Sequence, residues 1–491
     1  MPVLLLLAAL MPSADEQPNI VVILADDLGS GDVRPLNPES PIPTPGFDQL
    51  AVDGMTFTNA HTSAAVCTPT RYALLTGRHC WRTGLKKGVL GGYSRPLIED
   101  DRETVAQVAK RAGYRTAVIG KWHLGLGWTL KNDVDNLDDF SKPNAIGKVD
   151  FTQPLTASPN SLGFDHSFLV SASLDMSPYV YIADGRVTEQ PTQSKPAIPF
   201  PAFSRAGEQA PGFVIKDVLD TLTEQAAGFI EDAAGHSTEP FFLYLPLTSP
   251  HKPIATHPRF KGRSGIGPYG DFVAQTDDVI VRVRDALKNA GVADDTLVIV
   301  TSDNGSYMRL TEKTGHRDDP TVQAYRPQTH RPNAGYRGTK ADLYEAGHRV
   351  PFFAVWPGHI EPGARIDEPV TQVDLLATVA DLLGESFDAA SAEDSVSMLP
   401  LFRGEARDRR PIVVQSANGS LGLIDGNMKY LATDGSGGRE RPAGRPWKTP
   451  HQLYDLDADP GETNNLIDER PEIARSMLET LRAIEDGDAV R

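Results

Sequence analysis

The sequence has few cysteines, few basic residues and no long apolar run. Cys67 and Cys80 are the two cysteines among 491 residues, so a disulfide framework cannot be the basis of the fold. No stretch approaches the roughly 18 apolar residues of a membrane-spanning helix. Lys and Arg number 48 against 65 Asp and Glu, a net charge of −17, which argues against nucleic-acid binding. Any anionic substrate must therefore be held by local positive charge.

A short apolar run opens the chain. Residues 3–10 are continuously apolar, and Ser13 and Ala14 follow shortly before two acidic residues. This pattern predicts a signal peptide over residues 1–16, cleaved near Ala14, and therefore export to the periplasm or the outside of the cell. A basic segment before the run is missing, and the alternative is a buried N-terminal segment.

Short apolar, β-branched runs alternate with amphipathic helical patterns through most of the chain. The predicted strands are 19–25, 116–119, 241–247, 297–301 and 351–356, and the predicted helices are 104–112, 271–290 and 375–383. Such alternation predicts an α/β catalytic domain over residues 17–404, with a large, mostly parallel sheet flanked by helices. Short strands at 411–415, 421–425 and 428–432, followed by a helix at 472–484, predict a smaller α+β domain over 405–491.

Ionisable residues follow four of the predicted strands directly. Ligands of an open α/β sheet bind beyond the carboxyl ends of its strands, so we expect these four clusters to converge in one crevice. A solvated turn is the alternative for any single cluster. The clusters are Asp26-Asp27, Lys121-Trp122-His123, His251-Lys252 and Asp303-Asn304.

Oxygen donors dominate two of the clusters. Asp26, Asp27, Asp303 and Asn304 offer carboxylate and amide oxygens without any cysteine or histidine among them. Hard oxygen ligands favour Ca²⁺ or Mg²⁺ over zinc. The alternative for Asp26-Asp27 is a turn at the start of a helix.

Cys67 precedes a segment with helix-start and helix-stop signals. Thr68 is a suitable N-cap, Pro69 suits the first helical position, and Gly77 suits the position after the last turn. Cys67 is therefore predicted to lie immediately before a short helix, facing free backbone N–H groups. Arg71 adds a planar fork suited to an oxyanion. A packed, inert thiol is the alternative for Cys67.

With these motifs in place, the chain resembles the type I sulfatases of the alkaline-phosphatase-like superfamily, from residue 19 to about residue 465. The resemblance is carried, in family order, by PNIVVILADDLG, CTPTRYALLTGR, GKWHLG, SPHKP, TSDNG, GTKADLYEAGHRVP and YDLDADPGETNNL. It implies that a separate formylglycine-generating enzyme oxidises Cys67 to Cα-formylglycine. It also implies calcium rather than magnesium as the metal. The implied calcium ligands are Asp26, Asp27, Asp303 and Asn304, and the implied sulfate-contacting residues are Arg71, Lys121, His123, His251 and Lys340.

A hydrated aldehyde at position 67 explains sulfate ester cleavage better than a thiol does. One of its two hydroxyls attacks sulfur, with Asp303 and the metal favouring the deprotonated form. The other, deprotonated by His123, then collapses to the aldehyde and expels sulfate. His251 is the candidate acid for the departing alcohol. Outside these roles, Lys252 is expected to be a peripheral contact, Cys80 an inert core thiol, and Glu345, His348 and Arg349 packing residues.

The predicted function is removal of sulfate from a carbohydrate or aryl sulfate ester, with exo action on a sulfated carbohydrate preferred. The stretch HRPNAGYRGTKADLYEAGHRVPFF is most similar to galactosamine-6-sulfatases and arylsulfatase A. One alternative is hydrolysis of phosphodiesters or phosphonate monoesters, and another is a non-catalytic protein that binds sulfated glycans. A nearby loop either contacts neighbouring sugar groups or is a solvated basic loop; its residues are His316, Arg317, His330 and Arg331.

Overall fold

The computed structural model describes residues 17–131, 146–236, 239–387, 391–407 and 410–487. The predicted signal peptide, residues 1–16, lies outside the described residues. None of the helices in the described part of the chain combines the length and the apolar character needed to cross a bilayer.

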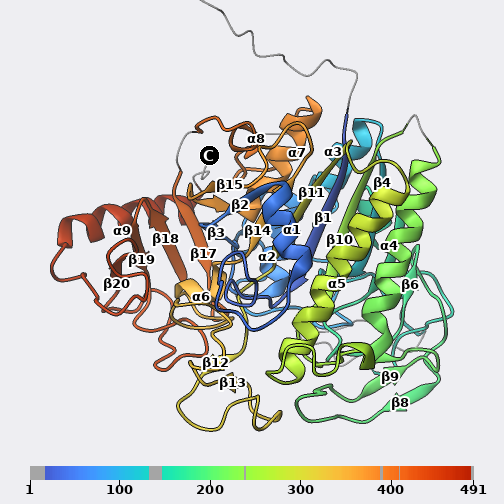
Figure 1. Ribbon diagram of the computed structural model, residues 1–491, viewed down its shortest axis with the longest axis horizontal. Helices are drawn as coiled ribbons and strands as arrows, with labels where there is room; N and C mark the ends of the chain where they lie inside the picture. Colours follow the sequence, from blue (N-terminus) through green and yellow to red (C-terminus); the bar gives the residue numbers. More distant parts are fainter. Residues whose placement is uncertain (1–16, 132–145, 237–238, 388–390, 408–409, 488–491) are drawn as a thin grey trace, which may run out of the picture.

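A ten-stranded mixed sheet forms the centre of the larger unit (Figure 1). Its five central strands, in the order β11-β1-β10-β4-β5, are all parallel, and antiparallel strands flank them. The predicted α/β class is confirmed. In sheet order the strands are β15 (Ala364–Ile366), β2 (Met55–Phe57), β14 (Phe352–Val355), β11 (Thr296–Ser302), β1 (Asn19–Asp26), β10 (Phe241–Pro250), β4 (Arg115–Lys121), β5 (His166–Val170), β6 (Ile182–Ala183) and β7 (Arg186–Val187).

The central strands are buried on both faces, which explains their continuous apolar sequences. Ile20 to Leu24 in β1 have no exposed surface, and Phe242 to Leu245 in β10 are equally buried. Two groups of helices cover the sheet, and the members of each group pack on one another. One group is α1 (Pro45–Asp53), α4 (Val218–Ala234) and α5 (Pro268–Asn289); the other is α2 (Cys67–Thr76), α3 (Val105–Arg111) and α7 (Leu375–Leu383).

A four-stranded antiparallel sheet with one helix forms the smaller unit near the C-terminus. Its hydrophobic core is separate from that of the large sheet, and helix α9 contributes Met477 and Leu481 to it. The predicted second, α+β unit is thus present. Its elements are β17 (Ile412–Gln415), β18 (Leu421–Asp425), β19 (Met428–Leu431), β20 (Gln452–Asp455) and α9 (Pro471–Asp486).

Short elements complete the chain. They include two-stranded ladders that pin loops to the main body, and two short helices. The ladder strands are β3 (Ala60–His61) with β16 (Val370–Thr371), β8 (Gln193–Lys195) with β9 (Gly207–Gln209), and β12 (Arg309–Leu310) with β13 (Ala324–Tyr325); the helices are α6 (Glu345–His348) and α8 (Leu399–Phe402).

A buried polar network joins the two units. The ammonium group of Lys429, on β19, lies 2.9 Å from Glu345 Oε1, 2.8 Å from Glu462 Oε1 and 3.0 Å from His348 Nε2. The other ring nitrogen of His348, Nδ1, lies 3.0 Å from Nδ1 of His61. All five side chains are fully buried. The segment that carries Lys340 is therefore held against the small sheet through the contacts of Glu345 and His348 with Lys429.

Replacing Lys429 by methionine should reduce the free energy of unfolding by about 3–5 kcal/mol, because it leaves Glu345 and Glu462 buried without their shared counter-charge. Urea unfolding measures this loss. Lys448→Met is the matched control: Lys448 is 48% exposed and pairs with Asp434 at 2.9 Å, so its removal should cost less than about 1 kcal/mol. Equal losses of unfolding free energy in the two variants would show that the buried network stabilises the protein no more than an exposed ion pair does.

Candidate active site

The four strand-end clusters meet at the carboxyl edge of the central strands. Asp26 is the last residue of β1, Lys121 is the last residue of β4, and Asp303 follows β11. His251 follows β10. The backbone N–H of Asp27 donates to Asp303 Oδ1 at 3.1 Å, which joins two of these strand ends directly. The predicted convergence is confirmed.

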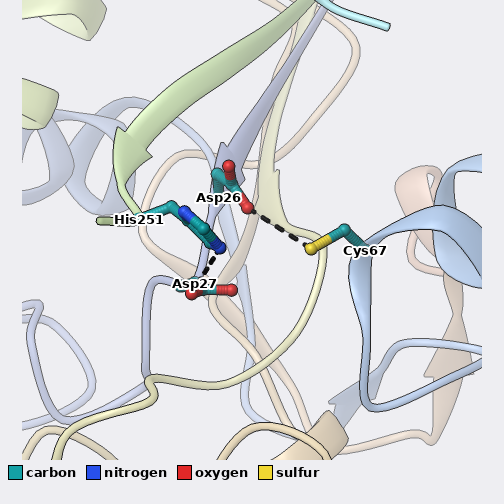
Figure 2. A group of neighbouring side chains, drawn as sticks. All are labelled: Asp26, Asp27, Cys67 and His251. Atoms are coloured by element: carbon teal, nitrogen blue, oxygen red, sulfur yellow. Dashed lines mark hydrogen bonds and ion pairs between the residues drawn. The ribbon is translucent and has the colours of Figure 1, made fainter. Parts of the chain in front are cut away.

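Cys67 is the first residue of helix α2 and lies within the cluster. Figure 2 shows its sulfur facing Asp26, with Sγ 3.7 Å from Asp26 Oδ1. The sulfur is also 3.3 Å from the ammonium nitrogen of Lys340. The unpaired N–H groups at the start of the ten-residue helix add positive potential here.

The predicted start of this helix is wrong by two residues, because the N-cap was expected at Thr68 and the first helical residue at Pro69. Val66 is the N-cap, and no side chain caps the helix. The Thr68 hydroxyl instead donates to the carbonyl oxygen of His123 at 3.0 Å and accepts from the N–H of Leu90 at 3.2 Å. These tertiary hydrogen bonds replace a capping contact. The predicted end is correct, because Gly77 takes the left-handed conformation that glycine favours there (φ 64°).

Three cations neutralise three carboxylates in the cluster. Arg71 donates to Asp303 Oδ2 through Nε at 3.0 Å and Nη2 at 2.7 Å. Lys121 Nζ donates to Asp26 Oδ2 at 2.7 Å. Lys340 Nζ donates to Asp27 Oδ1 at 2.5 Å. Burial alone would lower the pKa of Lys340, but Asp27 and the other acidic groups around it outweigh that effect and raise the pKa.

Asp27 also connects His251 and Asn304 to the cluster. Figure 2 shows His251 facing Asp27, with Nε2 3.6 Å from Asp27 Oδ2. Asn304 Nδ2 donates to Asp27 Oδ1 at 2.7 Å. The backbone φ of Asp27 is 68°, and the φ angles of His123 and Ala341 are 59° and 86°. Positive φ in residues other than glycine is strained, and such strain concentrates where the surrounding structure fixes a functional geometry.

His123 and His251 are in opposite tautomeric forms. The carbonyl oxygen of Leu90 lies 2.9 Å from His123 Nε2, and a carbonyl can only accept, so Nε2 carries the hydrogen and Nδ1 is a free lone pair. This Nδ1 is buried and has no hydrogen-bond partner in the described part of the chain. In His251 the carbonyl oxygen of Lys252 accepts from Nδ1, which leaves Nε2 as the lone pair. Burial lowers the pKa of both rings, that of His251 to about 3.

The cluster has the donor set of a hard-cation site. Asp26, Asp27 and Asp303 are at most 1% exposed, and Oδ1 of Asn304 is buried with no partner among the described residues. Burial and the neighbouring Asp26 carboxylate raise the pKa of Asp303. Three crowded carboxylates beside an unsatisfied amide oxygen fit a divalent cation such as Ca²⁺. With the three side-chain cations, such an ion would give the cluster a net charge of about +2, suited to an anionic ester.

As an unmodified residue, Cys67 is a poor nucleophile. Burial raises the pKa of its thiol to about 12, although Lys121 and Lys340 oppose the rise. The thiolate, which is the reactive form, is therefore rare near neutral pH.

Comparisons with known proteins show the family of the chain. The family model described as Sulfatase matches residues 18–385. The chain belongs to the sulfatase family. It is accordingly a sulfuric ester hydrolase, and its large mixed sheet with a separate small antiparallel sheet is the alkaline-phosphatase-like sulfatase fold.

Relatives of this sulfatase include proteins named for different sulfatase activities. It is 34% identical to an N-acetylgalactosamine-6-O-sulfatase of Bacteroides thetaiotaomicron, over 96% of this chain and 93% of the relative. It is 31% identical to arylsulfatase A of Bos taurus, over 96% and 88% of the two chains. A solved structure from a study of glycosaminoglycan metabolism by Bacteroides thetaiotaomicron has a TM-score of 0.80 and 31% identity, over 96% of this chain and 100% of that one.

His316 and His330, two residues of the basic loop, are hydrogen-bonded within the protein. His316 accepts from the backbone N–H of Tyr269 at 3.1 Å and its Nδ1 lies 2.9 Å from the carbonyl oxygen of Val322. His330 Nε2 lies 2.8 Å from Asp32 Oδ1. Both rings are buried, so they do not belong to a solvated loop, and sugar contact by either ring stays a prediction. Arg317 and Arg331 in the same loop are exposed.

The sequence reasoning missed two serines that follow the fifth parallel strand, β5. The carbonyl oxygen of Ser171 accepts from the N–H of His123 at 3.0 Å, which places this segment beside the cluster. The hydroxyls of Ser171 and Ser173 are buried without a partner in the described part of the chain. Their position after a central parallel strand was the available signal.

Glu345, His348 and Arg349 were expected only to pack. Glu345 and His348 lie in the network around Lys429, and Arg349 Nη1 donates to Glu345 at 3.0 Å.

Proposed function

We propose that this sulfatase removes terminal sulfate groups from a sulfated carbohydrate, with formylglycine at position 67 and a calcium ion in the cluster. The observation that carries the proposal is the position of Cys67 Sγ, 3.7 Å from Asp26 Oδ1 and 3.3 Å from Lys340 Nζ. The residue to be modified thus lies between a metal-ligand candidate and a sulfate-contact candidate. Similarity to an N-acetylgalactosamine-6-O-sulfatase over nearly the whole chain supports a carbohydrate substrate.

Asp26, Asp27, Asp303 and Asn304 would hold the calcium ion through their side-chain oxygens. When bound, calcium would attract the sulfate oxygens and favour the deprotonated nucleophile. Formylglycine would supply a hydrated aldehyde, whose two hydroxyls allow sulfur to be bound and sulfate to be released at the same carbon. We propose that a separate formylglycine-generating enzyme makes this modification and that the chain is exported.

The cations and histidines of the cluster would have separate roles in the reaction. Arg71, Lys121 and Lys340 offset the ester's negative charge; at an effective dielectric of about 20, each contributes roughly 4 kcal/mol at 4 Å. The free lone pair of His123 Nδ1 suits the base that takes a proton from the residue at position 67. His251 Nε2 suits the acid, because a bound anionic ester would raise the pKa of this ring and so oppose the effect of burial.

Mass spectrometry of the peptide containing residue 67 tests the modification. We expect one sulfur and two hydrogen atoms of the cysteine to be replaced by one oxygen atom in active protein. Cys80 in the same digest is the internal control and should remain a thiol. Active protein in which Cys67 is wholly unmodified would contradict the proposal.

Sulfate release from a panel of esters tests the substrate class. The panel contains 4-nitrophenyl sulfate, sulfated monosaccharides and a phosphodiester. Higher kcat/KM for a sulfated saccharide than for the aryl sulfate would support the proposal. Faster turnover of the phosphodiester would favour the phosphodiesterase alternative, and saccharide binding without turnover would favour a non-catalytic glycan-binding protein.

A further inference from the structure

Two cationic side chains without a carboxylate partner lie beside the active site. Lys252 directly follows His251, and Arg439 lies in the loop between β19 and β20 of the small unit. Among the described residues, neither side chain forms an ion pair or a hydrogen bond, although the protein has an excess of 17 negative charges. The Lys252 ammonium instead lies 4.8 Å from the ring centroid of Phe203.

The backbone fixes Arg439 against the segment that carries Lys340. The N–H of Arg439 donates to Asp342 Oδ1 at 2.5 Å. A Cβ atom on Gly438 would lie 2.3 Å from the carbonyl oxygen of Ala341, so the loop approaches this segment as closely as only glycine allows. The small unit thereby places an arginine next to a catalytic-site lysine.

The electrostatic environment of Lys252 agrees with this placement. Burial lowers its pKa, and the positive charges of Arg439 and Lys340 lower it further. Both cations are therefore close enough to repel the Lys252 ammonium. Asp175 and Asp27 act in the opposite direction, and Asp27 already pairs with Lys340. Lys252 and Arg439 are therefore the two cations that an anionic ligand can offset.

The surroundings also suit a sugar ring. Asp175 is 2% exposed and acts electrostatically on both His251 and Lys252. One of its carboxylate oxygens accepts from Arg205, and the other, Oδ1, has no partner in the described part of the chain. A buried carboxylate oxygen without a donor is costly, and a sugar hydroxyl can supply that donor. Phe203 adds a half-buried aromatic surface.

We propose that Lys252 and Arg439 form a subsite for a second anionic group of the substrate, next to the sulfate that is removed. This inference rests on the proposed carbohydrate sulfatase function and narrows it to polyanionic saccharides. The cations of the catalytic cluster already pair with Asp26, Asp27 and Asp303, whereas these two remain available to the ligand. Two chemical groups fit, the carboxylate of a neighbouring uronate and a second sulfate on the same ring.

Three substrates separate these possibilities. They are N-acetylgalactosamine 6-sulfate, a disaccharide with a uronate linked to the same 6-sulfated sugar, and N-acetylgalactosamine 4,6-disulfate. The measured quantity is the preference, the ratio of kcat/KM for each polyanionic substrate to that for the monosulfate. Lys252→Met and Arg439→Ala should each reduce the preference about tenfold, as expected for loss of a charge-assisted contact. The substrate whose preference falls identifies the anionic group.

Arg445→Ala is the matched control, an exposed arginine in the same loop, and it should retain the wild-type preference. Two results would overturn the subsite and leave the proposed function intact. In the first, the wild-type protein cleaves the monosulfate and shows no preference for either polyanionic substrate. In the second, the Lys252 and Arg439 variants keep the wild-type preference. If the wild-type protein hydrolyses 4-nitrophenyl sulfate but cleaves none of the three saccharides, both the subsite and the proposed carbohydrate sulfatase function are overturned.

Discussion

Replacing Cys67 by alanine is expected to lower kcat for sulfate ester hydrolysis by about 10⁴-fold or more, the scale of losses when other hydrolases lose their covalent nucleophile. The side chain at position 67 lies between Asp26 and Lys340 at the start of α2, where the proposed nucleophile is held. Alanine leaves the three paired carboxylates and cations in place. Sulfate release measured by ion chromatography would therefore report the loss of the nucleophile itself.

Cys80→Ala is the matched control for this variant. Cys80 is as buried as Cys67, at 2% exposure, but the hydrogen-bond neighbours of its sulfur are Thr83 Oγ1 and the carbonyl oxygen of Leu85, both at 3.9 Å. The change should cost about 1 kcal/mol of stability through a small cavity, and activity should stay within about twofold of wild type. A Cys67→Ala variant with more than about a tenth of wild-type kcat would contradict a nucleophilic role.

The convergence of the site was predictable because it follows from chain direction. Parallel strands place their carboxyl ends at one edge of a sheet, so Asp26, Lys121, His251 and Asp303 had to meet if their strands were neighbours. Lys340 follows no central strand, and only its family motif indicated a role. Its position depends on contacts distant in sequence, such as the hydrogen bond from the N–H of Ala341 to the carbonyl oxygen of Ala65 at 2.7 Å.

Features that depend on long-range pairing were not predictable. An apolar run such as 351–356 indicates a buried strand but not its direction, and β14 proves to be antiparallel to β11. The preference of Thr68 for an N-cap is worth only about 1 kcal/mol, which the contacts to His123 and Leu90 replace. The burial of Lys429 requires Glu345, which lies 84 residues away in the chain. Local patterns contain no information about such partners.

The second large effect is expected for Asp303→Asn, which should reduce both the affinity for calcium and kcat/KM by about 10²–10³-fold. The change removes one of three buried carboxylate charges, and a unit charge at 4 Å contributes roughly 4 kcal/mol at an effective dielectric of about 20. Calcium content after dialysis, measured by elemental mass spectrometry, gives a readout independent of activity. Added calcium in excess should restore part of the activity, since weaker binding is opposed by mass action.

Asp303 also pairs with Arg71, so the loss of a buried ion pair must be separated from the loss of a metal ligand. Asp394→Asn provides this separation, because Asp394 is 1% exposed and also accepts two hydrogen bonds from one arginine, Arg82, at 2.9 Å and 2.8 Å. It should lose stability but keep calcium and activity. If Asp303→Asn keeps its full calcium content, or if Asp394→Asn loses as much calcium as Asp303→Asn, the four oxygen donors are not the metal site. The charge balance of the cluster would then need a different explanation, because three cations already neutralise its three carboxylates and only an added ion gives it the positive charge that an anionic ester requires.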